Sequence, residues 1–228
     1  MKIIIINGSY RKNGATALIL HEMYQKLETY PNVEIHFYNI ADLNLQYCVG
    51  CCKCYKNGTC IFNDDIEKLS EDIATADGII IGSPTYASNV SGQMKVIIDC
   101  GHFVIEQLLF GKYAISVSTY ENYGGKDTVR ILNKLLCYSG ATISNSLVIK
   151  TPFSSNPLNN HKTHNRVNNA SHKFYEDIHN QKKYLCQKIR HFIRFQFGIP
   201  PFVRKKENEY QGVVTKWKKH GIKDSNIK

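Results

Sequence analysis

The sequence predicts an α/β fold in which a doubly wound, five-stranded parallel sheet carries helices on both faces. Four consecutive isoleucines occupy positions 3–6, and such an unbroken β-branched run is typical of a strand buried on both sides. Four further apolar runs follow along the chain, at 33–38, 78–82, 113–118 and 143–149. They alternate with segments of helical spacing, at 16–30, 64–76, 92–109 and 127–139. This alternation predicts a sheet that binds its ligand at the carboxyl ends of the strands, where the strand order reverses.

The last third of the chain predicts helices without further strands. Residues 151–170 are rich in Asn, Ser, His and Pro, which is typical of an ordered loop or a linker. A long amphipathic helix follows, and Pro200 and Pro201 are expected to end it. A further short helix is expected around Trp217, whose large ring would dock on the rest of the protein. We therefore expect a domain at 1–195 and a basic helical extension at 196–228.

The charge of the chain is concentrated in one part of it. The formal net charge is +10, and residues 151–228 hold 16 Lys and Arg against five Asp and Glu. Such a surface attracts nucleic acid, an anionic membrane or an acidic protein, although most basic runs are solvated faces only. No nucleic-acid motif accompanies the charge, so we expect no specific nucleic-acid partner. No apolar stretch is long enough for a membrane span or a signal-peptide core, so we expect a cytoplasmic protein.

The turn after the first strand predicts a site for an anion. Gly8 and Gly14 allow unusual backbone angles, and Arg11 provides a positive fork suited to a phosphate. Short polar side chains lie beside it, at Ser9, Asn13 and Thr16. A helix begins near Ala15, and helix amino termini bind anions. The turn matches neither the P-loop nor the dinucleotide fingerprint, so an ordinary turn with polar residues is the alternative.

Two more polar loops follow the third and fourth strands. The loop after the third strand offers Pro84, Thr85, Tyr86 and Asn89, of which Tyr86 has a flat ring that either meets a ligand or only packs. The loop after the fourth strand offers hydroxyls and glycines, at Ser118, Thr119, Tyr120, Gly124 and Gly125. Because the carboxyl ends of parallel strands share one edge of the sheet, the three loops are expected to converge on one crevice.

Five of the eight cysteines lie in one short window. Four follow the spacing C-x2-C-x2-C-x5-C, at Cys48, Cys51, Cys54 and Cys60, and Cys52 is extra. Thiolates at such short spacing suit an iron-sulfur cluster, while zinc, a redox disulfide and no metal at all are the alternatives. The remaining cysteines, Cys100, Cys137 and Cys186, are expected to be small core residues.

The motifs resemble a known family. Gly-Ser-x-Arg-x-x-Gly-x-Thr after the first strand and Pro-Thr-Tyr after the third are similar to the flavodoxin-like NAD(P)H-dependent FMN reductases, over residues 1 to about 150. The resemblance implies the strand order 2-1-3-4-5 and an FMN phosphate held by Ser9, Arg11, Asn13, Ala15 and Thr16. The cysteine spacing resembles the iron-sulfur flavoprotein branch, which implies a [4Fe-4S] cluster on Cys48, Cys51, Cys54 and Cys60. Cys100 stands where the family often has an arginine, so no role is carried to it.

These features predict an FMN-dependent oxidoreductase. It would take electrons from NAD(P)H or a protein donor and pass them to a quinone, flavin, aromatic or oxidant acceptor, with the cluster as a relay. No catalytic side chain is expected because the flavin carries the chemistry, and N–H groups of Gly124 and Gly125 would stabilise negative charge on the reduced ring. The alternative is an electron carrier or redox sensor whose basic extension docks an acidic protein such as a ferredoxin. The resemblance also implies a homodimer or homotetramer.

Overall fold

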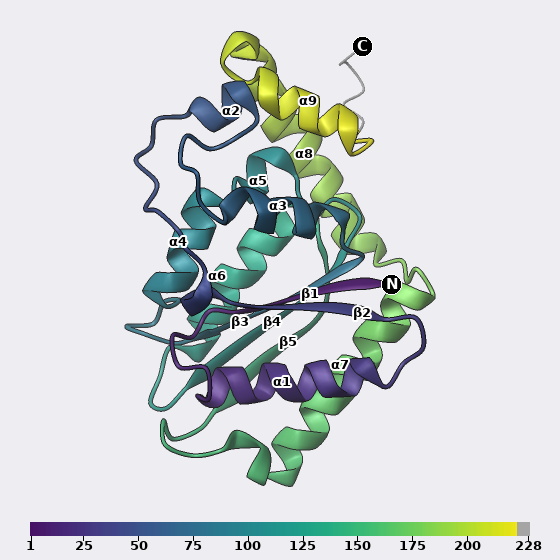
Figure 1. The fold of residues 1–228 in the computed structure, drawn as a ribbon. Coiled ribbons are helices and arrows are strands. Elements are labelled where there is room, and N and C mark those ends of the chain that lie inside the picture. The colour runs from purple at the N-terminus through teal and green to yellow at the C-terminus, as the bar shows by residue number, and fades with distance from the viewer. Residues whose placement is uncertain (223–228) are drawn as a thin grey trace.

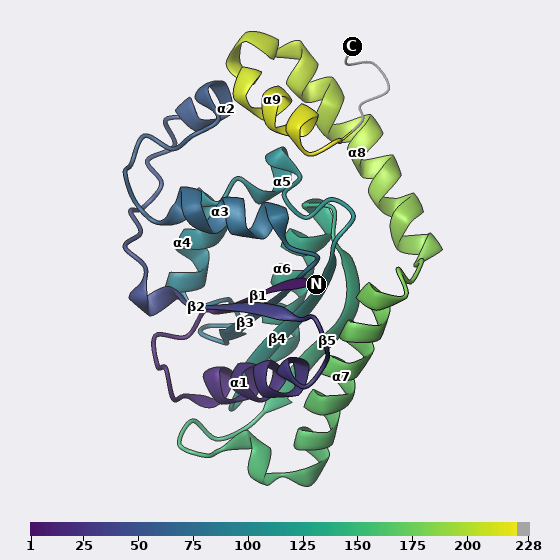
Figure 2. The same ribbon diagram turned by 45° about the vertical axis from the view of Figure 1, so that its right-hand side comes forward.

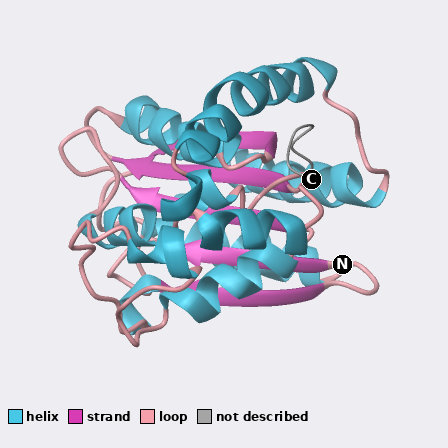
Figure 3. Cartoon of the chain, turned by 90° about the horizontal axis from the view of Figure 1, so that it is seen from above, coloured by secondary structure: helices cyan, strands magenta, loops and turns pink. Residues whose placement is uncertain are grey.

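The computed structural model describes residues 1–222 and contains one parallel sheet. Its five strands follow the order β2-β1-β3-β4-β5, which confirms the predicted fold class (Figure 1). The strands are β1 (Lys2–Asn7), β2 (Glu34–Asn39), β3 (Gly78–Pro84), β4 (Tyr113–Tyr120) and β5 (Thr142–Lys150). Their parallel arrows are seen from above in Figure 3. The order reverses at β1, so the crevice expected at a switch point lies at the carboxyl ends of β1 and β3.

Helices cover both faces of this sheet (Figures 1 and 2). The helices are α1 (Ala15–Glu28), α2 (Lys53–Asn57), α3 (Ile66–Thr75), α4 (Gly92–Cys100), α5 (Phe103–Glu106), α6 (Gly125–Tyr138), α7 (His161–His179), α8 (Leu185–Lys205) and α9 (Gln211–Lys219). Short 3-10 turns lie at η1 (Ile40–Asp42), η2 (Pro157–Asn159) and η3 (Glu207–Glu209). Helices α1 and α7 lie on one face, and α3, α4 and α6 lie on the other.

The isoleucine run forms the centre of both cores. Ile3 and Ile5 pack beneath α1 and α7, whereas Ile4 and Ile6 pack beneath α3 and α4. All four side chains are at most 1% exposed, as the strand period of two requires when both faces are covered. Burial of each contributes about 1.5–3 kcal/mol. The strand that carries the first polar loop is therefore one of the most firmly fixed elements of the fold.

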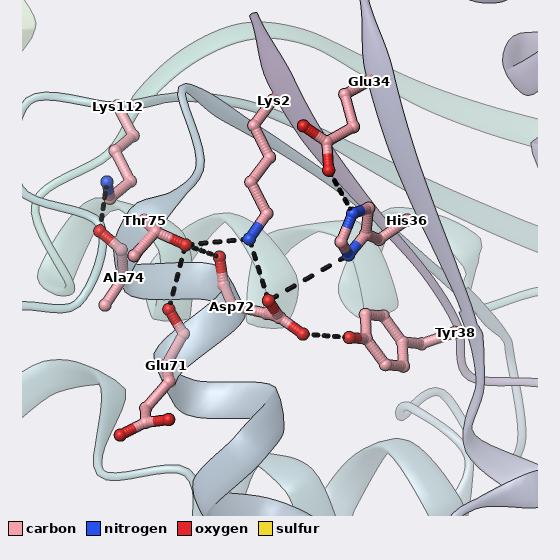
Figure 4. Close-up of polar contacts among 9 residues, drawn as sticks. All are labelled: Lys2, Glu34, His36, Tyr38, Glu71, Asp72, Ala74, Thr75 and Lys112. Atoms are coloured by element: carbon pink, nitrogen blue, oxygen red, sulfur yellow. Dashed lines mark hydrogen bonds and ion pairs between the residues drawn. The ribbon is translucent and has the colours of Figure 1, made fainter.

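A polar network around Asp72 holds α3 against the first two strands (Figure 4). Lys2 Nζ donates to Asp72 Oδ1 at 2.8 Å, and the Tyr38 hydroxyl donates to Oδ2. Burial alone would raise the pKa of Asp72, but the hydrogen bonds from Lys2 and Tyr38 outweigh it and hold that pKa below its usual range. Burial and the bond to Asp72 raise the pKa of Tyr38. The network therefore works with an ionised Asp72 and a neutral Tyr38.

The C-terminal third differs from the prediction in three places. The expected linker at 151–170 is wrong in its second half, because α7 begins at His161, where the Asn160 side chain accepts hydrogen bonds from two backbone N–H groups of the first turn. The expected long amphipathic helix is two helices, with Gln181 in the left-handed region at φ 47° between them. Pro200 and Pro201 lie inside α8 rather than at its end.

The prolines are accommodated because the helix is held on both sides of them. Phe195 and Val203 are buried in a third cluster together with Trp217. The indole Nε1 of Trp217 donates to the Ile105 carbonyl oxygen at 2.9 Å, which confirms its docking role. The expected division at residue 195 stays a prediction; that position lies within α8, and residues 223–228 of the extension lie outside the described residues.

Candidate functional site

The first polar loop, after β1, and the second polar loop, after β3, meet at the switch point. The Gly8 backbone N–H donates to the Gly82 carbonyl oxygen at 2.7 Å. A Cβ at Gly8 would lie 2.8 Å from that oxygen and 2.7 Å from Met94 Cε, so a glycine is needed for this close approach. Ser91, the N-cap of α4, donates from its hydroxyl to the Gly8 carbonyl oxygen. The two loops are therefore fixed to one another and to the start of α4.

The third polar loop, after β4, contacts the other two through buried hydrogen bonds and close packing. The Thr16 and Thr119 hydroxyls lie 2.7 Å apart in a buried hydrogen bond, and the Thr85 N–H donates to the Thr119 carbonyl oxygen at 2.8 Å. Gly124, at φ 84°, lies so close to the second loop that a Cβ would be 2.7 Å from Ser88 Cα. The structure thus brings together the carboxyl ends of β1, β3 and β4, as the sequence predicts.

The first loop is shaped by its own side chains. The Ser9 N–H donates to Asn7 Oδ1 at 3.1 Å, and the Arg11 N–H donates to Ser9 Oγ at 3.1 Å. The loop ends at Gly14, the N-cap of α1, where no side chain of the described residues caps the helix and the first turn has no acidic residue. The N–H groups of this turn lack intrahelical partners and carry a partial positive charge. Their arrangement suits an anion.

Arg11 and Asn13 are exposed above this helix end. The guanidinium Nη1 of Arg11 donates to the Phe153 carbonyl oxygen at 3.2 Å. The Phe153 N–H in turn donates to Glu121 Oε2 at 3.1 Å. A fourth loop, after β5, therefore links Arg11 to the third loop, and sequence reasoning missed it. Its position directly after the last strand was the signal that could have identified it.

The second loop presents an exposed aromatic ring. Backbone N–H groups of Tyr86 and Asn89 donate to one another's carbonyl oxygens, each at 3.0 Å, and Ala87 and Ser88 between them have φ of 49° and 60°. These angles are typical of a tight type I′ turn. Tyr86 is 47% exposed. Beside it, Thr85 Oγ1 is buried and has no hydrogen-bond partner among residues 1–222, which is uncommon for a buried hydroxyl.

Other residues predicted for the site hold its shape. Pro84 and Ser118 are buried, and the Ser118 hydroxyl donates to the Gly125 carbonyl oxygen at 2.8 Å. A Cβ on Gly125 would lie 2.3 Å from the Tyr120 ring, so this glycine is required by the close packing. These residues fix the third loop against α6.

The cysteine window forms a second, separate site. One small pocket of about 20 Å³ is lined by Cys48, Cys51, Cys52, Cys54 and Cys60, together with Cys100 and His102. All of these thiols are free of disulfides. Burial raises the pKa of Cys54 to about 12 and that of Cys100 to about 11. In the described part of the chain no three His, Cys, Asp or Glu side chains lie close enough to hold a single metal ion. Cys100 is buried as predicted, but its place on this pocket was missed. The predicted core position is wrong for Cys186, which is exposed on α8, and Cys137 on α6 is only partly buried.

The two ends of the window are joined to one another and to α4. Asp65 and Asp64 accept hydrogen bonds from the backbone N–H groups of Asn44 and Gln46, at 2.7 Å and 2.8 Å. Cys100, the last residue of α4, donates its thiol to the Gln46 carbonyl oxygen at 3.2 Å. Since Ser91 caps the other end of α4 at the first loop, the nine residues of this helix separate the two sites by about 13 Å.

The C-terminal extension packs onto the cysteine window. Helix α9 lies beside α2 (Figure 1), and a Cβ on Gly212 would lie 2.1 Å from the Gly58 backbone nitrogen. The rings of Tyr55 and Tyr210 are stacked with centroids 5.0 Å apart. Lys216 reaches 3.0 Å from the fully buried carboxylate of Glu106. The described part of the basic extension, up to residue 222, thus packs against the cysteine window.

The sheet order and the loops at its carboxyl edge define a flavodoxin-like protein. The family model described as NADPH-dependent FMN reductase matches residues 1–153. An iron-sulfur flavoprotein of Clostridioides difficile (strain 630) is 38% identical over 97% of this chain and 100% of its own. Another, from Methanocaldococcus jannaschii, is 34% identical over 61% of this chain and 74% of its own. The chain belongs to the NADPH-dependent FMN reductase family, in its iron-sulfur flavoprotein branch.

Solved structures agree on the fold. An NADH:FMN oxidoreductase in its apo form superposes with a TM-score of 0.57 at 20% identity, covering 76% of this chain and 87% of that one. An archaeal flavodoxin gives 0.53 at 14% identity, over 78% and 99%. The family defines the activity class as FMN-dependent oxidoreduction. No helix within residues 1–222 is both long and apolar enough to cross a membrane.

Proposed function

We propose that this protein binds FMN at the convergent loops, oxidises NAD(P)H or a protein donor, and reduces a small quinone, flavin, aromatic or oxidant acceptor. The convergence itself carries the proposal, because it brings an uncapped helix end, the Arg11 guanidinium group and the buried, unpartnered Thr85 hydroxyl to one edge of the sheet. Bound FMN would supply the hydride and one-electron chemistry. The protein then has to bind, orient and stabilise charge.

Each part of the crevice has a distinct task in this proposal. Ser9, Arg11, Asn13, Ala15 and Thr16 hold the phosphate through the loop and the first turn of α1. Thr85 offers its free hydroxyl to the ring system, and Tyr86 and Asn89 line the ring from the second loop. Backbone N–H groups of Gly124 and Gly125 stabilise the negative charge that reduction places on the pyrimidine side.

A direct test is to purify the protein and titrate it with FMN. We expect Arg11→Ala to weaken FMN binding at least tenfold, because hydrogen bonds to charged groups contribute about 1.5–3 kcal/mol. Arg166→Ala, an exposed arginine on α7, is the matched control and should bind FMN normally. A protein that purifies colourless and does not bind added FMN would contradict the proposal.

For the second site we propose a [4Fe-4S] cluster held by Cys48, Cys51, Cys54 and Cys60. Four thiols of suitable softness line one pocket, and the relatives named above are iron-sulfur flavoproteins. Cluster binding would deprotonate Cys54, whose pKa burial raises in the metal-free chain. Anaerobically prepared protein should contain iron and labile sulfide in equal amounts. Cys54→Ser should lose both iron and sulfide. The matched control is Cys186→Ser, at an exposed cysteine of α8, which should lose neither. Protein that holds zinc or no metal would contradict the assignment.

An electron carrier is the second candidate, favoured by the basic extension. Helix α8 has no Asp or Glu among its 21 residues, and such a surface would dock an acidic donor such as a ferredoxin. If NADH or NADPH bleaches the flavin within turnover times, the protein is a reductase. Reduction by a protein donor alone, with a steep salt dependence, supports the carrier.

We also propose a homodimer or homotetramer. The support is the outer face of α8, where four large apolar side chains are about half exposed or more, namely Leu185, Ile189, Ile193 and Phe197. A contiguous apolar surface of this kind marks an interaction site on a folded protein.

A further inference from the structure

A cavity of about 450 Å³ lies between α8 and the amino-terminal ends of β4 and β5. Tyr113 and Thr142, the first residues of those strands, line it. The convergent loops lie at the opposite, carboxyl edge, so this cavity is separate from the proposed FMN site. Figure 2 shows α8 alongside the β5 side of the sheet. A volume of this size is typical of small-molecule pockets.

Aromatic rings form a large part of the lining of this cavity, beside the polar side chains of Gln187, Lys188 and Gln196. Phe110, Phe192 and Phe195 join Tyr113 around it. The rings of Phe110 and Phe195 pack against the His191 ring, with centroid distances of 5.6 Å and 5.9 Å. Flat apolar walls of this kind favour a flat, largely apolar ligand, because stacking and apolar burial both reward it.

His191 supplies one specific polar feature. Its Nε2 is buried and has no hydrogen-bond partner within the described chain. The Cys137 backbone acts on the ring as a hydrogen-bonding partner, and because Nε2 has no partner we assign this contact, and the ring proton, to Nδ1. Burial lowers the pKa of His191, so the neutral ring keeps a lone pair on Nε2. An orphaned acceptor in an apolar wall requires a donor from the ligand.

We propose that this cavity binds a flat aromatic molecule that carries a hydroxyl group, with the hydroxyl donating to His191 Nε2. Lys188 also lines the cavity, and its ammonium group favours a ligand that carries partial negative charge on an oxygen. A carboxylate or ether oxygen has no proton to donate and leaves Nε2 unsatisfied. The ligand class is therefore a phenol or naphthol, and binding is independent of FMN.

The test uses the full chain and equilibrium dialysis with 2-naphthol and 2-methoxynaphthalene, which differ in the donor hydrogen. We expect saturable binding of 2-naphthol about fivefold tighter than its methyl ether, the effect of one net hydrogen bond. In His191→Leu the preference should vanish, and in His161→Leu, an exposed histidine of α7, it should persist. A preference that survives His191→Leu overturns the proposal, because binding is then elsewhere, including over the flavin.

A measurement on the unmodified protein covers the case in which His191→Leu fails to fold. The ¹⁵N resonance of His191 Nε2 should shift on addition of 2-naphthol and stay unchanged with 2-methoxynaphthalene. No shift with either compound overturns the proposal, because 2-naphthol then does not reach His191. A dimer by light scattering that does not bind 2-naphthol also overturns it, because the cavity is then closed by a second copy.

Discussion

The ion pair between the C-terminal extension and the body of the protein offers a quantitative test. Glu106 is fully buried, and Lys216 Nζ from α9 lies 3.0 Å from its Oε2. Lys216 Nζ also lies 3.1 Å from Oε1, and His102 Nδ1 lies 3.3 Å from that same oxygen. Replacement of Lys216 by Met keeps most of the length of the side chain and removes its charge, so that the carboxylate loses its closer partner.

The expected magnitude follows from burial. Breaking a buried pair by removal of one partner costs about 3–5 kcal/mol. Because Lys216 is itself 18% exposed and His102 stays in place, we expect the lower end, about 3 kcal/mol. Glu106→Gln added to Lys216→Met removes the orphaned charge, so the double variant should recover most of this loss.

Urea unfolding followed by circular dichroism measures both variants. Lys218→Met, an exposed lysine on the same helix, is the matched control and should change the free energy of unfolding by less than about 0.5 kcal/mol. If Lys216→Met behaves like Lys218→Met, or if the double variant is as unstable as the single one, α9 is not held by this charge pair and the reasoning is refuted.

Three further predictions test other parts of the structure. Asp72 has a lowered pKa, so its contribution to stability is present above about pH 4 and is lost as the pH falls through the folded-state pKa. Between pH 5 and pH 3 the free energy of unfolding in urea should therefore fall less in Asp72→Asn than in the unmodified protein, and equal falls would contradict this. Gly124→Ala should lower the free energy of unfolding by at least about 1 kcal/mol and weaken FMN binding, because Gly124 has a positive φ and lies against the Ser88 backbone. Its control is Gly198→Ala inside α8, where a Cβ meets open space, and this change should be neutral or stabilising. Phe197→Asp should lower the mass measured by light scattering to that of a monomer; an unchanged oligomer would remove α8 from the interface.

The sheet and its loops could be predicted because their signals are local. The isoleucine run at 3–6 is typical of a strand covered on both faces, and in a parallel sheet the loops that follow the strands all lie at the same edge. Asn160 shows the limit of such signals. Its capping role was hidden in a segment rich in Asn and Ser, where any of several residues could end a loop.

The remaining errors have non-local causes. Pro200 and Pro201 usually end a helix, and only the burial of Phe195 and Val203 against Trp217 keeps α8 continuous through them. Cys100 reaches the cysteine pocket from α4, forty residues after the window ends. Contacts of this kind depend on tertiary packing, which no spacing along the chain encodes.

The placement of α4 makes the two cofactor proposals separable by experiment. Its first turn is fastened to the first polar loop through Ser91 and Gly8, and its last residue, Cys100, faces the cysteine pocket. About 13 Å of rigid helix lies between them. A variant that empties the pocket, such as Cys54→Ser, therefore leaves the phosphate loop in place and should lose iron while retaining FMN. Loss of both groups together would mean that the window and the crevice fold as one unit, and the division into two sites would be wrong.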